Sequence, residues 1–308
     1  MDTTLIRSGA SRGAVVVTGT STGIGQACAL SLDALGIRVF AGVRKSGDGD
    51  SLRQASSARL TPFFIDVTDE RSITAAAEKV SREVGNAGLV GLVNNAGVAI
   101  PGPLEYLLLG ELRRQLEINL VGQLAVTQAF LPLLRKARGR IVNISSLAGK
   151  LTTPFNGAYS AAKHGMEAFS DALRMELVPW SIHVSVVEPG TIATAMPRKL
   201  LQDADAVLGG LPPEGRERYG EAFETYVRTL AEHAQTGSPP EVVSRAVVHA
   251  LTAKTPRTRY PAGAPAGRML ALYRLLPDRL LDSVILRFLG LPRAFGARHE
   301  PQVSCPIS

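Results

Sequence analysis

The feature that most constrains the fold is an alternation of short apolar runs with helix-like stretches. The first run is AVVVT at 14–18, and others follow at 37–43, 60–67, 89–94, 139–146, 181–190 and 257–261. Several are nearly continuous apolar residues, which is typical of strands covered on both faces. Helix-like stretches separate them, so the sequence predicts an α/β fold, a Rossmann-type doubly wound parallel sheet of about seven strands.

Two segments depart from this alternation. We expect a single domain over residues 1–263, in which the insertion at about 191–238 forms a helical lid over a substrate site. Residues 264–308 are expected to form a C-terminal amphipathic extension. Its apolar residues recur on one helix face, namely Leu280, Leu281, Val284, Ile285, Phe288 and Leu289. This face can pack within the protein, cover the mouth of the site, contact a second subunit, or lie on an anionic membrane surface.

Composition excludes several classes of function. The net charge is +7, and residues 254–300 hold nine Lys or Arg against three Asp or Glu, without any nucleic-acid-binding motif. The two cysteines lie far apart, and the five histidines form no ligand cluster, so no metal site is predicted. The start of the chain lacks the apolar core of a signal peptide, and no uncharged apolar run reaches about 18 residues. We therefore expect a cytoplasmic protein, or one peripheral at a membrane.

A glycine-rich loop follows the first predicted strand. TGTSTGIG places Gly19, Gly23 and Gly25 between that strand and the next helix. Glycines there let the backbone turn tightly and approach a pyrophosphate at the helix N-terminus. A purely structural turn is the weaker interpretation. The loop therefore predicts a dinucleotide site.

The end of the second predicted strand bears on which dinucleotide binds. An acidic residue there would bind a ribose 2′-hydroxyl, whereas a basic one suits a 2′-phosphate. This strand ends with Val43, Arg44 and Lys45, which favours NADP with NAD as the alternative; a solvated strand end is the competing interpretation. Asp66, at the end of the third strand, is placed either to meet the adenine edge or to cap the following helix, where Thr68 and Asp69 compete.

A phenol and an ammonium group share one predicted helix face. Tyr159 and Lys163 are four residues apart in YSAAKHGMEAF. A neighbouring cation lowers the pKa of a phenol from about 10 toward neutrality, which makes it a usable acid or base. The spacing alone is also compatible with surface residues.

Taken together, the motifs resemble the short-chain dehydrogenase/reductase family. They are TGxxxGxG at 18–25, NNAG at 94–97, NISS at 143–146, YxxxK at 159–163 and PG at 189–190, in order over about 12–260. Stretches such as DVTDERSITAAAEKV and EAFSDALRMEL also resemble the retinol and hydroxysteroid dehydrogenase branch. Many vertebrate members carry a membrane anchor at the N-terminus, and we expect none here, which puts their membrane topology in doubt for this chain.

The resemblance implies roles for particular residues. Tyr159 would be the catalytic acid or base, Lys163 would lower its pKa and hold the nicotinamide ribose, and Ser146, with Ser145 as the nearby alternative, would bond the reacting oxygen. Asn119 would kink its helix and hold a water that links Lys163 to solvent. The implied cofactor residues are Gly19, Thr20, Ser21, Thr22, Gly23, Ile24, Gly25, Arg44, Lys45, Asp66, Val67, Asn95, Ala96, Gly97, Tyr159, Lys163, Pro189, Gly190, Ile192 and Thr194.

The expected activity is NAD(P)-dependent interconversion of an alcohol and a carbonyl on a lipophilic substrate, such as a steroid, a retinoid or a long-chain alcohol. Ser146, Leu151, Phe155, Tyr159 and Met196 are the predicted substrate contacts. Reduction of a 3-oxoacyl thioester is the alternative activity, and a non-catalytic dinucleotide sensor is the alternative class. The family also implies a homodimer or homotetramer.

Overall fold

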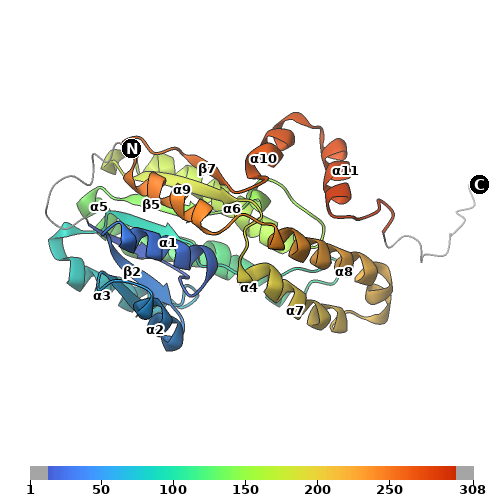
Figure 1. Ribbon diagram of the computed structural model, residues 1–308, viewed down its shortest axis with the longest axis horizontal. Helices are drawn as coiled ribbons and strands as arrows, with labels where there is room; N and C mark the ends of the chain where they lie inside the picture. Colours follow the sequence, from blue (N-terminus) through green and yellow to red (C-terminus); the bar gives the residue numbers. More distant parts are fainter. Residues whose placement is uncertain (1–12, 296–308) are drawn as a thin grey trace, which may run out of the picture.

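A seven-stranded parallel sheet forms the centre of the molecule (Figure 1). The computed structural model describes residues 13–295, apart from a few side chains. The strands lie in the order β3-β2-β1-β4-β5-β6-β7, and every neighbouring pair is parallel. They are β1 Ala14–Val17, β2 Arg38–Val43, β3 Leu60–Phe64, β4 Gly91–Asn94, β5 Arg140–Ile144, β6 His183–Pro189 and β7 Arg259–Ala262. The predicted doubly wound sheet is confirmed.

Helices cover both faces of the sheet because successive strand residues point to opposite sides. The helices are α1 Gly23–Ala34, α2 Ser46–Gln54, α3 Glu70–Val84, α4 Leu109–Leu116, α5 Gly122–Ala137, α6 Gly157–Glu176, α7 Ala195–Gly209, α8 Pro213–Gln235, α9 Glu241–Thr252, α10 Ala266–Leu275 and α11 Asp278–Phe288. In β1, Val15 and Val17 pack with α1 and α9, whereas Val16 packs with α3 and α5. All three valines are fully buried, as the apolar run predicts.

The helical stretch between β4 and β5 is interrupted. A π-turn, η2 at Glu117–Val121, separates α4 from α5 and contains Asn119. Among the described residues, Leu109–Ala137 is the one stretch long and apolar enough to cross a membrane, and 44% of its most apolar window is buried. The stretch is not an uncharged apolar run, because it holds Glu111, Arg113, Arg114, Glu117, Arg135 and Lys136, so the expectation about uncharged runs is not contradicted. The α5 part packs on the sheet through Val126, Phe130 and Leu134, as a core helix does.

A third apolar core lies outside the sheet layers. Residues of α7, α8 and α11 meet there around Phe155, Phe223 and Tyr226. Figure 1 shows α7, α8, α10 and α11 gathered at one end of the molecule, away from α2 and α3. The remaining short turns are η1 Gly85–Ala87, η3 Leu147–Gly149 and η4 Val178–Trp180.

The helix predicted in the C-terminal extension is present, but its apolar face is divided. Leu281, Ile285 and Leu289 are buried in the third core. Leu280 and Phe288 are 55% and 42% exposed. Packing within the protein therefore accounts for one row of the predicted apolar face and leaves the other row facing outward.

Candidate active site

The glycine loop forms a cradle at the carboxyl end of β1. Gly19 and Gly23 have φ angles of 67° and 59°, in the left-handed region that favours glycine. A Cβ at Gly25 would lie 2.2 Å from the Gly19 carbonyl oxygen, so a side chain would not fit there. The residues fit a dinucleotide, because a close backbone approach at the start of α1 is what a pyrophosphate needs.

Two polar residues fix this loop to the neighbouring strand. Asn95, which follows β4, donates through Nδ2 to the carbonyls of Thr18 and Gly19, both at 2.9 Å. The Thr18 hydroxyl accepts from the backbone N–H groups of Asn95 and Ala96, both at 3.0 Å. Asn95 therefore holds the cradle to the end of β4, and its implied role at the cofactor stays a prediction.

One cavity of about 470 Å³ runs from this loop to the third core. All the predicted cofactor residues line it except Thr20. The Thr20 side chain is buried and its hydroxyl donates to the Gly42 carbonyl at 3.0 Å, so it binds β2 instead. The sequence could not reveal this, because neighbouring loop residues differ only in the direction of their side chains.

Arg44 and Lys45 lie at one end of this cavity, with Asp66 nearby. Both basic residues are exposed and line the cavity, and Asp48 in the first turn of α2 lines it too. Asp66 Oδ1 accepts from the Thr68 backbone N–H at 3.0 Å and hydroxyl at 2.8 Å. Burial alone would raise the pKa of Asp66, but these bonds and the Arg44 charge hold it below its usual value. Asp69, through its bond from Arg71 N, caps α3, so the capping alternative for Asp66 is wrong.

Ser146, Tyr159 and Lys163 converge at the middle of the cavity. Ser146 ends the segment after β5, and the other two lie on α6. Lys163 Nζ donates to the Ile144 carbonyl at 2.8 Å and lies 5.7 Å from the centre of the Tyr159 ring. Ser146 hydrogen-bonds the phenol, whereas the buried Ser145 Oγ has no partner among the described residues.

Burial and nearby polar groups shift the pKa values of Tyr159 and Lys163. Burial raises the pKa of Tyr159 above its usual value, and only the Ser146 hydrogen bond opposes it. The ammonium group donates to Ile144, and the predicted lowering of the phenol pKa by Lys163 stays a prediction. Burial lowers the pKa of Lys163 to about 8, and the Glu167 carboxylate opposes this change.

Asn119 is fully buried in the π-turn. Its Oδ1 accepts from Val98 N at 2.9 Å and its Nδ2 donates to Val98 O at 2.8 Å. The irregular helix is therefore present where it was predicted, and the amide holds the cavity-lining segment at Val98. The predicted water link to Lys163 stays a prediction.

The other end of the cavity is apolar, and its lining partly differs from the prediction. Leu151 lines it, but Phe155 does not; its ring packs against Tyr219, Phe223, Tyr226 and Phe295. Phe155 has a φ of 62°, which turns it into the third core. The Met196 side chain lies outside the described residues. Residues from the lid and the extension complete the lining, namely Leu200, Tyr226, Leu230, Pro265, Met269, Ile285 and Phe288.

Tyr226 is the main polar residue that the sequence did not reveal. It lies on α8, is buried, and hydrogen-bonds Thr153, which also lines the cavity. Burial raises its pKa to about 12, with a further contribution from the nearby Tyr159. Its position among the apolar residues of the insertion suits a lid over the site and gives no signal of a polar role there.

A nucleotide-binding sheet with a serine, a tyrosine and a lysine beside the cradle defines a dinucleotide-dependent oxidoreductase. A short chain dehydrogenase profile matches residues 13–205. The chain belongs to the short-chain dehydrogenase family and lies near its retinol and hydroxysteroid dehydrogenase branch. It is thus an NAD(P)-dependent oxidoreductase acting on an alcohol or carbonyl.

Individual relatives support this placement. Retinol dehydrogenase 5 of Mus musculus is 40% identical over 284 residues, covering 90% of this chain and 89% of that protein. The 17-beta-hydroxysteroid dehydrogenase type 6 of Bos taurus is 39% identical, covering 89% and 87%. A short-chain dehydrogenase structure from Streptomyces avermitilis has a TM-score of 0.71 at 29% identity, covering 92% and 96%. One from Burkholderia cenocepacia in complex with NADP has a TM-score of 0.67 at 25% identity, covering 92% and 99%.

Proposed function

We propose that the protein is an NADP-preferring oxidoreductase that interconverts a hydroxyl and a carbonyl on a lipophilic substrate, such as a steroid, a retinoid or a long-chain alcohol. The observation that carries this proposal is the continuity of the cavity. It joins the glycine cradle, the Ser146, Tyr159 and Lys163 group, and an apolar end in one space.

The proposed chemistry assigns a separate task to each residue. The bound cofactor supplies a hydride to the carbonyl carbon during reduction. Negative charge then develops on the carbonyl oxygen, and Tyr159 donates a proton to it while Ser146 stabilises it by a hydrogen bond. The raised pKa of Tyr159 keeps the phenol protonated at neutral pH, which is the form that reduction requires. Lys163 carries positive charge beneath the phenol and contributes to holding the nicotinamide ribose.

A lipophilic substrate fits the far end of the cavity. Leucine, isoleucine, methionine and phenylalanine side chains from the lid and extension dominate it. Tyr226 and Thr153 add hydroxyl groups beside the reacting centre, where a hydroxyl or carbonyl of the substrate would lie. The relatives named as retinol and hydroxysteroid dehydrogenases support the same substrate class.

The NADP preference rests on Arg44 and Lys45. Two cations at the end of β2 suit a 2′-phosphate, because charged hydrogen bonds to phosphate are strong. Asp48 is the nearby negative group that opposes this preference. The complex of a structural relative with NADP is compatible with a preference for NADP or for NAD in this chain.

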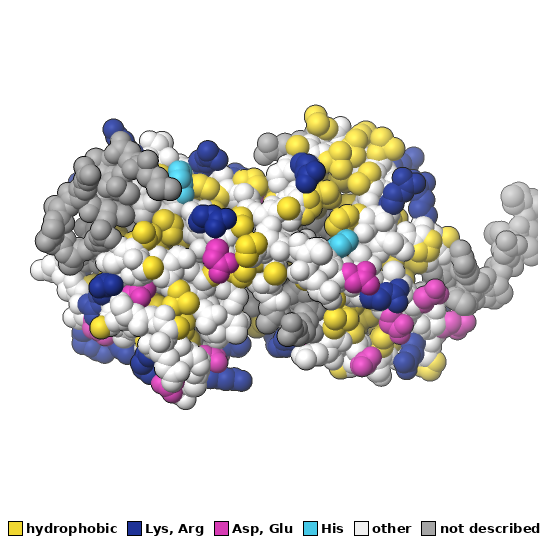
Figure 2. Space-filling view, in the orientation of Figure 1, with side chains coloured by type: hydrophobic (Ala, Val, Ile, Leu, Met, Phe, Trp, Pro, Cys, Tyr) yellow, Lys and Arg dark blue, Asp and Glu magenta, His cyan; other side chains and the backbone are white. Residues whose placement is uncertain are grey.

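We further propose a peripheral contact with a membrane surface through α11. Figure 2 shows apolar side chains gathered over the region of α10 and α11, with Lys and Arg side chains beside them. Phe288 belongs to the outward row of α11 and also lines the cavity. A lipophilic substrate dissolved in a membrane would thus reach the cavity directly. A cytoplasmic location and a homodimer or homotetramer stay predictions.

A substrate panel tests the activity. The purified chain is mixed with NADPH or NADH and with steroid, retinoid and long-chain ketones or aldehydes, and absorbance is followed at 340 nm. Turnover on at least one lipophilic carbonyl, faster with NADPH, is expected. Binding of the cofactor without turnover on this panel would instead favour 3-oxoacyl-thioester reduction or a sensing role.

A further inference from the structure

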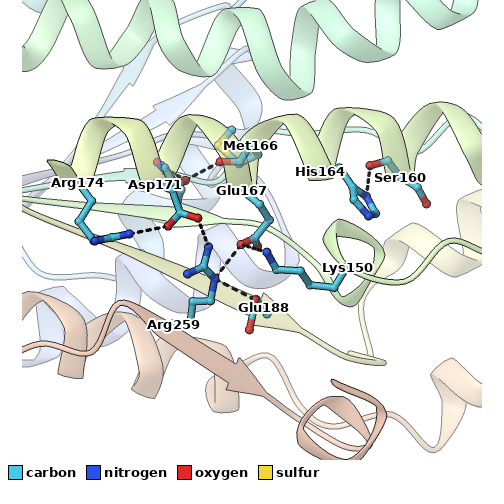
Figure 3. Close-up of polar contacts among 11 residues, drawn as sticks. Lys150, Ser160, His164, Met166, Glu167, Asp171, Arg174, Glu188 and Arg259 are labelled. Atoms are coloured by element: carbon cyan, nitrogen blue, oxygen red, sulfur yellow. Dashed lines mark hydrogen bonds and ion pairs between the residues drawn. The ribbon is translucent and has the colours of Figure 1, made fainter. Parts of the chain in front are cut away.

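A cluster of charged side chains lies along α6, between this helix, β6 and β7 (Figure 3). Glu167 is at its centre, and its side chain is 4% exposed. Its Oε2 accepts from Lys150 Nζ and from Arg259 Nε, both at 3.1 Å. Two cations thus compensate one buried carboxylate, which would be costly to bury without a charged partner.

Arg259 extends the cluster to two other elements. It donates from Nη2 to Asp171 on α6 at 2.7 Å. Its Nε lies 3.6 Å from Glu188, a buried residue of β6. Arg174 pairs with Asp171 at 3.0 Å and completes the cluster at the exposed edge.

The cluster joins three segments that carry the site. Lys150 follows Ser146 through the short turn η3. Glu188 directly precedes Pro189 and Gly190, which line the nicotinamide end of the predicted cofactor site. Glu167 is one helical turn from Lys163 on α6, so the two side chains share a face.

One carboxylate oxygen of Glu167, Oε1, is buried without a hydrogen-bond partner among the described residues. Lys150, which directly follows η3, and Arg259 of β7 pair with the carboxylate. Asp171 and Glu188 are the other acidic partners of Arg259. Lys163 lies on the same helix as Glu167. Among the described charged groups, Glu167 is the one whose carboxylate raises the pKa of Lys163 against the effect of burial.

We propose that Glu167 is a positioning residue that keeps Lys163 protonated at neutral and mildly alkaline pH, and that Lys150 and Arg259 hold it in place for this purpose. Lys163 is deeply buried, and burial favours its neutral form. The negative charge of Glu167 counteracts that effect. Lys150 and Arg259 partly neutralise this charge, so removing either cation strengthens its effect on Lys163.

A purely structural role for the cluster makes a different prediction. Breaking a buried ion pair destabilises a protein because one charge loses its partner. That loss would lower stability in every variant of the cluster, whatever the charge removed. It would not move the titration of Lys163 in opposite directions. The sign of the change in each variant therefore separates the two roles.

The direct test follows Lys163 itself. The protein is labelled with [13Cε]lysine, and the Lys163 resonance is identified by its loss in Lys163→Met. Its titration is then recorded by NMR between pH 6 and 11. Glu167→Gln, which keeps the shape of the side chain, is expected to lower the midpoint by about one pH unit. Lys150→Gln is expected to raise it, and Glu176→Gln, the same change at an exposed position of α6 outside the cluster, is the matched control and leaves it in place.

An unchanged midpoint in Glu167→Gln, or a fall in Lys150→Gln, would overturn the proposal. If Glu167→Gln does not fold, the direction of the change in Lys150→Gln decides alone, because Lys150 is 27% exposed and lies at the edge of the cluster. This readout needs no substrate, so it stands whether or not the proposed activity is found.

A second readout rests on the proposed function. If Lys163 must be protonated for turnover, the alkaline limb of the activity profile moves to lower pH in Glu167→Gln by the same amount. An active wild type with an unmoved alkaline limb would contradict the role of Glu167 and leave the activity itself supported. An inactive wild type would contradict the activity, while the NMR titration would still decide the role of Glu167.

Discussion

At the scale of single residues, burial shifts the pKa values of the proposed catalytic residues Tyr159 and Lys163. The Tyr159 and Lys163 spacing predicts that both lie on one helix face, and the structure confirms it. The spacing does not predict where the ammonium group points. It donates to Ile144, a residue 19 positions earlier in the chain, and such a contact depends on how α6 packs against β5. The sequence therefore reveals the residues and not their protonation.

Burial of the Lys163 ammonium group should destabilise the folded protein. Its pKa of about 8 in the folded state is below the usual 10.5, so the unfolded state binds more protons between these values. The penalty is full below pH 8 and is relieved as the pH rises from 8 to 10.5. Lys163→Met should therefore be more stable than wild type by about 2 kcal/mol at pH 7, after allowance for the lost Ile144 bond.

Urea unfolding at pH 7 and at pH 10 measures this difference. The advantage of Lys163→Met should shrink at pH 10, and turnover should be lost at both pH values. A variant that is less stable than wild type at pH 7 would mean that the ammonium group is not penalised by burial. That result would contradict the inference that burial of Lys163 destabilises the folded protein.

Arg44 should determine the choice of cofactor. Arg44→Asp should weaken NADPH binding roughly 10-fold to 100-fold, because a charged hydrogen bond is replaced by repulsion, and should affect NADH much less. Titration of both cofactors by fluorescence measures this. Arg53→Asp on α2 makes the same charge change away from the cavity lining and should leave both affinities in place. An equal loss for both cofactors in Arg44→Asp would show that Arg44 does not contact a 2′-phosphate.

At the scale of elements, the lid and the C-terminal extension form one unit around Phe155. The apolar periodicity of 280–289 predicts α11, but periodicity cannot say that one row of the face is buried and the other exposed. Phe155 was predicted as a substrate contact from its place between Ser146 and Tyr159. Its left-handed backbone turns it into the lid instead, and nothing in the residue type predicts such a conformation.

The outward row of α11 should bind an anionic membrane surface. Full-length protein should co-sediment with vesicles containing phosphatidylserine, and more weakly with phosphatidylcholine alone, because Arg279 and Arg287 lie beside the apolar row. Leu280→Glu should reduce binding at least about 10-fold, since a buried leucine contributes roughly 1.5–3 kcal/mol.

Val178→Glu supplies the matched control for that experiment. Val178 is 67% exposed on η4, and the change adds the same charge away from α11. Equal binding by wild type and Leu280→Glu would assign membrane contact to another surface. No sedimentation of the wild type with either vesicle would remove the membrane proposal.

At the scale of the whole molecule, the sheet was predictable and the third core was not. The order of apolar runs and the glycine loop define the parallel sheet, because buried strands and tight turns each have a local sequence pattern. The third core is made by segments about 130 residues apart, such as Leu151 and Ile285. Its contacts depend on tertiary packing that no local pattern encodes. The Glu167 cluster has the same origin, since Arg259 reaches α6 from β7.

The most direct test of the account is a paired measurement on wild type and Tyr159→Phe. Each protein is titrated with NADPH and then given the best lipophilic carbonyl from the panel, with a single turnover followed at 340 nm. We expect both to bind NADPH alike and hydride transfer in Tyr159→Phe to fall at least about 100-fold, because the proton donor is gone. Comparable hydride transfer in the two proteins would contradict the assignment of Tyr159 as the acid and, with it, the proposed mechanism.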